Sequence, residues 1–314
     1  MKQKITIGTR SSKLALWQAD YVADCLRKQY PDLVVEKKLM TTKGDKILDA
    51  PLAKIGGKGL FTKELEQAML DGEIDLAVHS LKDMPTEVPE GLILAAITER
   101  YDPGDAFVSN TYQSFAELSQ GAKVGTSSLR RKAQLLHVRP DLQIESLRGN
   151  VNTRLQKLDE GQFDAAILAV AGLKRLGFAG RITEVLPQSV ILPAVGQGAL
   201  AIETREDDKE VRELIAFLND EATAHCAQAE RAFLARVEGG CQVPVGVYAV
   251  PLEAGKGLHI EAVIASLDGQ RLYRDTIEGP VSDAENLGTK LADQLLQAGG
   301  LAIMHELGLL LDRK

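Results

Sequence analysis

One cysteine of this chain, Cys241, stands where its thiol could react. It follows two glycines in the segment 238–244, which reads EGGCQVP. Glycines let another molecule approach the backbone closely, and the proline stiffens the chain after the turn. A thiol held in this way is a candidate attachment point or nucleophile. A free cysteine is also among the most often buried residue types, so on this segment alone a core position is an equal alternative.

A second candidate for chemistry is the charged pair Lys82 and Asp83, which follows a strand predicted at residues 74–78. Ligands of open α/β sheets bind at the carboxyl ends of strands, and an acid placed there can transfer protons or stabilise positive charge. Taken alone, Asp83 would fit a helix cap or an ion pair equally well. His79 is predicted to be structural, because a lone histidine in a buried strand more often serves packing than catalysis.

Two segments repeat one anion-binding device. Residues 8–12 (GTRSS) and 125–128 (GTSS) each follow a predicted strand and open a predicted helix. Serines there can cap a helix, and the free N–H groups and the helix dipole attract anions. Capping alone would explain either serine pair, but the same device in both halves of the chain points to one ligand cleft.

Arginines accompany this device. Arg10 lies in the first copy, Arg130 and Arg131 follow the second, and Arg148 and Arg154 flank the start of the next predicted helix. Planar guanidinium groups suit carboxylates, which they bind through two hydrogen bonds, although phosphate would also fit. The chain has neither a Walker-type loop nor a Gly-x-Gly-x-x-Gly turn, so nucleotide binding has no support.

The charge is unevenly distributed. The net charge is −7, yet residues 121–157 contain eight Lys or Arg residues and only two acids. A basic pocket in an acidic protein favours a small anionic ligand over nucleic acid. A solvated, charged helix face is the alternative interpretation of such a run.

The composition is that of a globular protein of more than one domain: 314 residues, 45% hydrophobic and 26% charged. No apolar run is long enough to span a bilayer, and the N-terminal residues do not resemble a secretory signal, so no membrane association and a cytoplasmic location are expected. Three widely spaced cysteines predict neither a disulfide framework nor a metal site.

Strand and helix patterns alternate over the first two thirds of the chain, which predicts two α/β lobes. The first lobe is assigned residues 1–100 and 194–217, because the strand at 199–203 can return to the first sheet; the second lobe is assigned 101–193. Residues 218–314 read as a small α+β domain with an antiparallel sheet and a closing helix. The polar loop 41–59 is expected to be a mobile lid.

Taken together, six ordered motifs resemble the porphobilinogen deaminase (hydroxymethylbilane synthase) family, almost from end to end. They are GTRSSKLAL (8–16), GGKGLF (56–61), HSLKDMP (79–85), GTSSLRR (125–131), LRGNV (147–151) and the stretch from Glu230-Arg231 to GGCQVP (239–244). After residue 251 the match holds only in outline. The resemblance implies three domains: two lobes like those of periplasmic binding proteins, joined by a hinge, and a smaller C-terminal domain that carries Cys241.

The resemblance also implies an activity. The family joins four porphobilinogen molecules head to tail, with loss of ammonia, onto a dipyrromethane primer attached to Cys241 by a thioether, and then releases the linear hydroxymethylbilane by hydrolysis. Asp83 would be the catalytic residue that stabilises the positively charged azafulvenium ring. By the same match, further residues would hold the cofactor and the substrate: Ser12, Lys82, Thr126, Ser128, Arg130, Arg131, Arg154 and Gln197 for the cofactor, and Arg10, Arg148, Arg154 and Arg175 for the substrate. A monomer without metal is expected.

Two other classes of protein fit parts of the pattern. A two-lobed binding protein for a carboxylated solute would share the fold without catalysis. A cysteine-nucleophile hydrolase or acyltransferase would need a histidine near the thiol, and His225 is the nearest in sequence. A covalent adduct on Cys241 that persists through turnover distinguishes the deaminase from both.

Overall fold

The protein is an α/β protein with two α/β lobes and a smaller α+β domain at the C-terminal end. The computed structural model describes residues 2–46, 59–237, 243–252 and 255–308. The chain divides into two compact units, Met1–Tyr101 with Ala199–Ala224, and Asp102–Gly198 with His225–Lys314. The residue boundaries of the three domains expected from the sequence stay a prediction.

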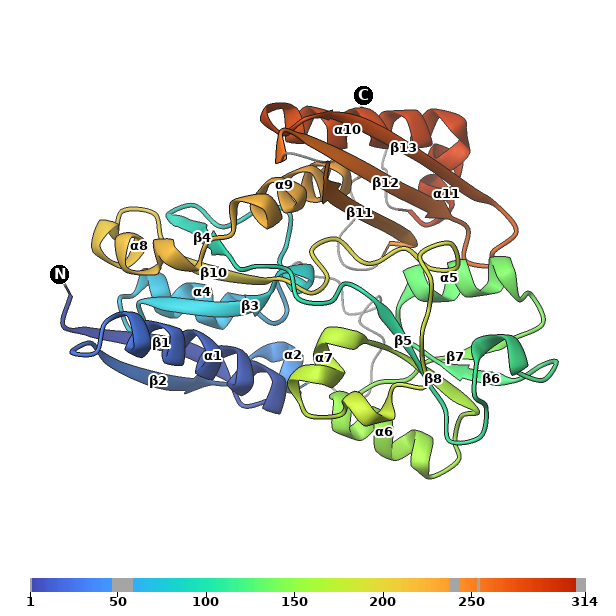
Figure 1. The fold of residues 1–314 in the computed structure, drawn as a ribbon, viewed down its shortest axis with the longest axis horizontal. Helices are drawn as coiled ribbons and strands as arrows, with labels where there is room; N and C mark the ends of the chain where they lie inside the picture. Colours follow the sequence, from blue (N-terminus) through green and yellow to red (C-terminus); the bar gives the residue numbers. More distant parts are fainter. Residues whose placement is uncertain (1, 47–58, 238–242, 253–254, 309–314) are drawn as a thin grey trace. The chain divides into compact units, whose positions relative to one another are not determined.

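The first unit contains a five-stranded mixed sheet of order β2-β1-β3-β10-β4. Its strands are β1 (Lys4–Arg10), β2 (Val34–Met40), β3 (Leu76–Ser80), β4 (Leu92–Ile97) and β10 (Leu200–Arg205). β1 is parallel to β2 and β3, whereas β10 is antiparallel to β3 and β4. The late strand therefore returns to the first sheet, as the sequence predicts (Figure 1).

The helices of this unit are α1 (Lys13–Gln29), α2 (Lys43–Lys46), α4 (Lys63–Leu70) and α8 (Lys209–Ile215). α1 begins where the Ser12 hydroxyl accepts a hydrogen bond from the Ala15 N–H, and its buried residues recur at helical spacing against the sheet. α2 occupies part of the predicted loop 41–59, whose residues 47–58 lie outside the described residues.

The second unit repeats the strand order in a second five-stranded sheet, β7-β6-β8-β5-β9. Its strands are β5 (Asp105–Val108), β6 (Lys123–Gly125), β7 (Gln143–Glu145), β8 (Ala165–Ala169) and β9 (Glu184–Val185). Its helices are α5 (Leu129–Val138), α6 (Val151–Asp159) and α7 (Val170–Arg175).

The sequence analysis missed β5 and β9. β5 has only four residues, all buried, and it follows a Pro-Gly pair that reads as a break.

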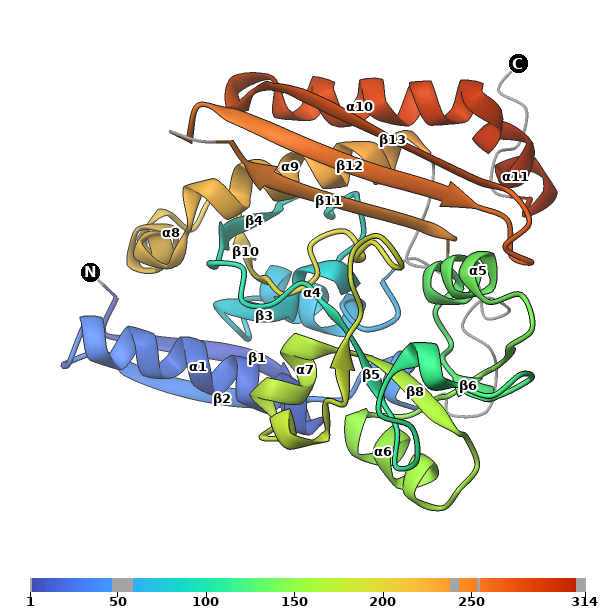
Figure 2. The same cartoon turned by 45° about the vertical axis from the view of Figure 1, so that its right-hand side comes forward.

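The C-terminal part of this unit has an antiparallel sheet of β11 (Val245–Pro251), β12 (Gly257–Ala265) and β13 (Leu272–Pro280). Three helices accompany it: α9 (Glu221–Arg236), α10 (Ala284–Leu295) and α11 (Leu301–Glu306). Figures 1 and 2 both show α10 running alongside the strands. Apolar side chains of α9, α10 and the sheet form one core, as expected for an α+β domain.

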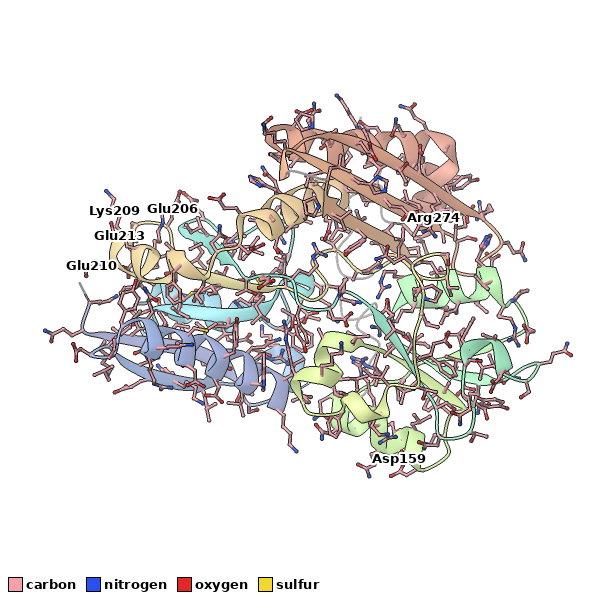
Figure 3. The ribbon with its side chains drawn as sticks, viewed as in Figure 1. Asp159, Glu206, Lys209, Glu210, Glu213 and Arg274 are labelled. Carbon is pink, nitrogen blue, oxygen red and sulfur yellow. The ribbon has the colours of Figure 1, made fainter. Side chains whose placement is uncertain are left out.

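The outer surfaces are charged. Figure 3 shows charged side chains that extend from α8 and from the turn before it: Glu206, Lys209, Glu210 and Glu213. The apolar residues of the same helix, Val211, Leu214 and Ile215, are buried. This division between faces explains why a short helix stays attached to the lobe. Within the part of the chain described, no helix combines the length and apolarity needed to cross a membrane.

The contact between α9 and α10 leaves no room for a side chain at Gly288. A Cβ atom there would lie 2.0 Å from the Ala229 carbonyl oxygen, and this backbone atom cannot rotate away. We expect Gly288→Ala to lower the free energy of unfolding by about 3 kcal/mol, at the upper end for overpacking. Urea unfolding measures the change, with Gly180→Ala as the control, since a Cβ at Gly180 meets nothing within 4 Å. Equal stability of the two variants would contradict the close contact.

Candidate functional site

A small pocket lies at the carboxyl ends of β1 and β3. The two strands are parallel neighbours, so their ends meet at one edge of the sheet. Arg10 ends β1, Ser80 ends β3, and the short 3₁₀ helix Leu81–Asp83 carries Asp83 into the same wall. The cavity measures about 60 Å³ and is lined by Arg10, Ser12, Leu14, Ala15, Gln18, Phe61, Thr62, Leu65, Val78, His79, Ser80 and Asp83.

Several polar groups of this pocket have fixed positions. The Arg10 guanidinium carbon lies 4.3 Å from the centre of the Phe61 ring, a distance at which the cation and the aromatic face attract. Gln18 donates a hydrogen bond of 2.7 Å from Nε2 to Ser80 Oγ. The sequence placed His79 and Ser80 after the strand, but β3 lies two residues later than predicted and includes both. The pocket thus combines a carboxylate, a guanidinium and hydroxyl groups on a rigid frame.

In the second unit, the predicted residues Thr126 and Ser128 lie where β6 passes into α5. Thr126 Oγ1 accepts a hydrogen bond from the Ser128 N–H, and Ser128 Oγ accepts one from the Arg131 N–H. Ser128 is therefore the N-cap of α5, as Ser12 is of α1. Both serine pairs open helices at strand ends, which confirms the local structure that the repeated motif predicted.

Arg130 and Arg131 are buried and share one counterion, Asp105. Arg130 Nη1 lies 2.6 Å from Asp105 Oδ2, and Arg131 Nη2 lies 2.6 Å from Asp105 Oδ1. Further N–H groups of the two arginines donate to the Leu192 and Ile167 carbonyls. Only 5% of each arginine is exposed. Ion pairs and hydrogen bonds to buried protein groups therefore fix both side chains, which the sequence did not predict.

Gln197 joins the same network. Its Nε2 donates to the Pro103 carbonyl at 2.6 Å and lies 3.2 Å from Asp105 Oδ1. Three predicted site residues, Arg130, Arg131 and Gln197, therefore converge on a carboxylate that the sequence analysis missed. The only signal was an acid next to the apolar residues 106–108, inside a segment interpreted as a break.

The charges of this network are strongly coupled. Burial by itself would raise the pKa of Asp105, but the adjacent guanidinium groups of Arg130 and Arg131 outweigh burial and hold that pKa well below its usual range. Asp105 is therefore ionised at neutral pH. Two arginines and one aspartate leave one positive charge, which suits a ligand carboxylate.

The remaining predicted arginines of this unit lie near helix ends. Arg148 precedes Gly149, whose φ of 112° is in the region that favours glycine, and Asn150 caps α6. Arg154 Nε donates to the Gly149 carbonyl at 2.8 Å, and Arg175, at the end of α7, donates to the Gly198 carbonyl at 2.8 Å.

The structure thus gathers the predicted residues into two groups. Arg10, Ser12 and Asp83 line the pocket of the first unit, next to Lys82, which lies in the same 3₁₀ helix as Asp83. Thr126, Ser128, Arg130, Arg131 and Gln197 form the second group, around α5 and Asp105. Cys241 lies outside the described residues.

Comparison with known proteins decides the family. Residues 5–213 match the model of the porphobilinogen deaminase dipyrromethane cofactor-binding domain, and residues 224–297 match that of the porphobilinogen deaminase C-terminal domain. The chain belongs to the porphobilinogen deaminase family. The resemblance noted in the sequence is confirmed.

Curated relatives cover nearly the whole chain. The porphobilinogen deaminase of Geobacter sulfurreducens is 58% identical over 96% of this chain and 94% of that protein. The enzyme of Geobacter metallireducens is 55% identical over 97% and 95%. Among solved structures, the methionine-binding protein MetQ is 17% identical over 68% of this chain and 89% of that chain, with a TM-score of 0.44, a likeness too distant to carry an argument.

The buried Asp105 makes a prediction for stability. We expect Asp105→Asn to lower the free energy of unfolding at pH 7 by about 3–5 kcal/mol, because it leaves two buried guanidinium groups without a counterion. A carboxyl whose pKa is lowered by folding stabilises the fold above its ordinary pKa of about 4, and this contribution is lost as the pH falls below that value. Unfolding curves of the variant should therefore depend less on pH than wild type in this acid range.

The control for this measurement is an exposed ion pair. Arg236 and Asp293 lie 2.6 Å apart at the surface of the same unit, so Asp293→Asn should cost at most about 1 kcal/mol. If Asp105→Asn cost no more than Asp293→Asn, the buried network would not support this lobe.

Proposed function

We propose that this chain is a porphobilinogen deaminase, a transferase that condenses four porphobilinogen molecules and releases hydroxymethylbilane, a step of tetrapyrrole biosynthesis. The observation that carries the proposal is the family match across both family domains, at 58% identity to a curated relative. The pocket that contains Asp83 and the arginine network around Asp105 support it, because the substrate carries both a cationic aminomethyl group and carboxylates.

The described residues fit the dipyrromethane cofactor that the family domain binds. A dipyrromethane carries acetate and propionate groups, and the site offers cations and N–H donors: the remaining positive charge of the Asp105 network, and the capped N-termini of α5 and α6. Cys241 would form the covalent bond to the cofactor. The residues that would hold it are Thr126, Ser128, Arg130, Arg131, Arg154 and Gln197, with Ser12 and Lys82 of the first unit. When bound, the cofactor supplies the pyrrole carbon to which the first substrate is joined.

Arg10, Arg148, Arg154 and Arg175 would bind substrate carboxylates. The contact with Phe61 orients Arg10 in the pocket wall, and the hydrogen bonds to the Gly149 and Gly198 carbonyls orient Arg154 and Arg175. Guanidinium groups oriented in advance lose less entropy when a carboxylate binds.

Asp83 would act on the aminomethyl end of the substrate. When ammonia leaves, the electron pair of the C–N bond goes with it and the pyrrole becomes a cation. A carboxylate fixed beside this cation stabilises the developing charge and so lowers the barrier. We also expect a monomer that works in the cytoplasm without nucleic acid, in keeping with the net charge of −7.

Cofactor attachment can be tested by intact mass. We expect purified protein, or apoprotein incubated with porphobilinogen, to carry a mass increment of two substituted pyrroles on the peptide that contains Cys241. Cys241→Ser should lose the increment and nearly all activity, while Cys25→Ser keeps both. An increment that persists in Cys241→Ser would place the attachment elsewhere.

The role of Asp83 can be tested separately. We expect Asp83→Asn to retain the covalent cofactor but to turn over about 100- to 10,000-fold more slowly, since the amide cannot balance the developing charge. Steady-state assays measure the loss, with Asp71→Asn as a control at an exposed position of the same unit. Near-normal turnover of Asp83→Asn would remove this residue from the reaction.

A further inference from the structure

Two buried titratable side chains, His79 and Glu203, lie together next to the Asp83 pocket. In the antiparallel pairing of β3 with β10, His79 is opposite Ala201 and Glu203 is opposite Ala77. Because residues two apart share a face of the sheet, His79 and Glu203 point to the same side. His79 Nε2 lies 3.0 Å from Glu203 Oε2, and both side chains are buried.

The contact defines where one proton sits. A carboxylate can only accept, so with Glu203 ionised the Nε2 atom of His79 carries the hydrogen, and Nδ1 is the nitrogen left to gain or lose a proton. Such an arrangement, in which a buried carboxylate fixes the tautomer of a histidine, is the one that enzymes use to orient an acid–base imidazole.

A further acid of this lobe, Glu66 of α4, is also buried. Burial raises the pKa of the Glu66 carboxyl, and the charge of Glu203 raises it further. Within the described part of the chain, the second oxygen of Glu203, Oε1, is shielded from solvent and has no hydrogen-bond partner. A buried oxygen of this kind requires a hydrogen-bond donor, such as a water molecule, to compensate for its burial.

His79 belongs to the pocket as well as to the pair with Glu203. It lines the cavity together with Asp83, Arg10 and Ser80. The charged groups that line this pocket with His79 are Arg10 and Asp83, and Glu66 of α4 interacts electrostatically with both His79 and Glu203. A structural histidine needs no access to a ligand cavity, whereas an acid–base residue requires it.

We propose that His79 is an acid–base residue of this pocket and that Glu203 positions it. This inference rests on the proposed function and names a group that the reaction needs in addition to Asp83.

The chemistry requires a proton acceptor at each condensation. A bond forms between the aminomethyl carbon of one pyrrole and the free α-carbon of another, while the C–N bond breaks and ammonia leaves with its electron pair. The attacked α-carbon then loses its hydrogen as a proton, and that electron pair restores the aromatic ring. The aminomethyl group enters as an ammonium ion, so one proton is released for each ammonia. Neutral His79 accepts this proton at Nδ1 and passes it to water or to the departing ammonia.

The first test needs no turnover. In the full-length protein, ¹⁵N-labelled histidines are followed by NMR against pH, with His79→Gln used to assign the signal. We expect Nε2 of His79 to stay protonated and Nδ1 to titrate. Glu203→Gln should change the tautomer of His79 and leave His259 unchanged, since that histidine pairs with Glu278 at the surface. A His79 ring that shows no titration, or that does not respond to Glu203→Gln, overturns the proposal.

The second test is kinetic and uses porphobilinogen deuterated at its free α-carbon. His79→Gln should lower kcat about 100-fold or more, within the range for a lost general base, with little change in KM. Loss of the α-hydrogen should then limit the rate, so that a deuterium isotope effect absent in wild type appears, and added imidazole should restore part of the rate. Glu203→Gln is measured in parallel, because it keeps the shape of the core, and it should show the same isotope effect at a smaller rate loss. His259→Gln is the control and should behave as wild type.

The outcomes separate the two proposals. Wild-type protein that does not convert porphobilinogen refutes the proposed function itself. Wild-type turnover with unchanged kcat in His79→Gln, or a loss without an isotope effect or imidazole rescue in both variants, refutes only the role of His79.

Discussion

The second lobe depends on one buried carboxylate shared by two arginines. Asp105 begins β5, and Arg130 and Arg131 lie in the first turn of α5, so their contact fixes the helix start against the sheet. Arg130 also donates to the Leu192 carbonyl, which ties the chain segment before Gln197 to the same point. None of these charges could be buried alone, since each would then face the full cost of leaving water. The network is stable only when all of its members are present, and this requirement sets the positions of the residues that surround it.

The first lobe also buries a carboxylate, but its partner there is a histidine instead of two arginines. There the buried carboxylate of Glu203 pairs with the imidazole of His79, whereas Asp105 pairs with two guanidinium groups. The arginine network leaves one positive charge in the second lobe, whereas the histidine pair of the first lobe borders the pocket that contains Asp83. The two lobes thus share a strand order but differ in the charged groups that they bury.

The C-terminal part of the second unit is attached through buried polar contacts as well as apolar packing. Glu230 of α9 accepts hydrogen bonds from the Gly196 and Ala249 N–H groups, at 2.7 and 2.9 Å. One fully buried carboxylate therefore connects the turn that presents Gln197 with β11. This explains why a glutamate lies among the buried residues of α9, because its oxygens satisfy backbone donors that would be unpaired in the core. Glu230 consequently fixes the turn before Gln197 relative to β11.

The sequence alone determined the family, the alternation of strands and helices, and the helix caps at Ser12 and Ser128, because these depend on local spacing and on motifs that are contiguous in the chain. For the same reason it predicted a helix directly after residues 125–128, which the structure shows as α5 (Leu129–Val138). The partners of the charged residues were decided only by the tertiary structure. Asp105 and Arg130 are 25 residues apart in the sequence, and His79 and Glu203 are 124 residues apart, yet each pair is in contact. No local pattern specifies such pairs, since they arise when separate strands and helices are brought together. β5 was missed because it is a strand of four residues directly after a Pro-Gly pair.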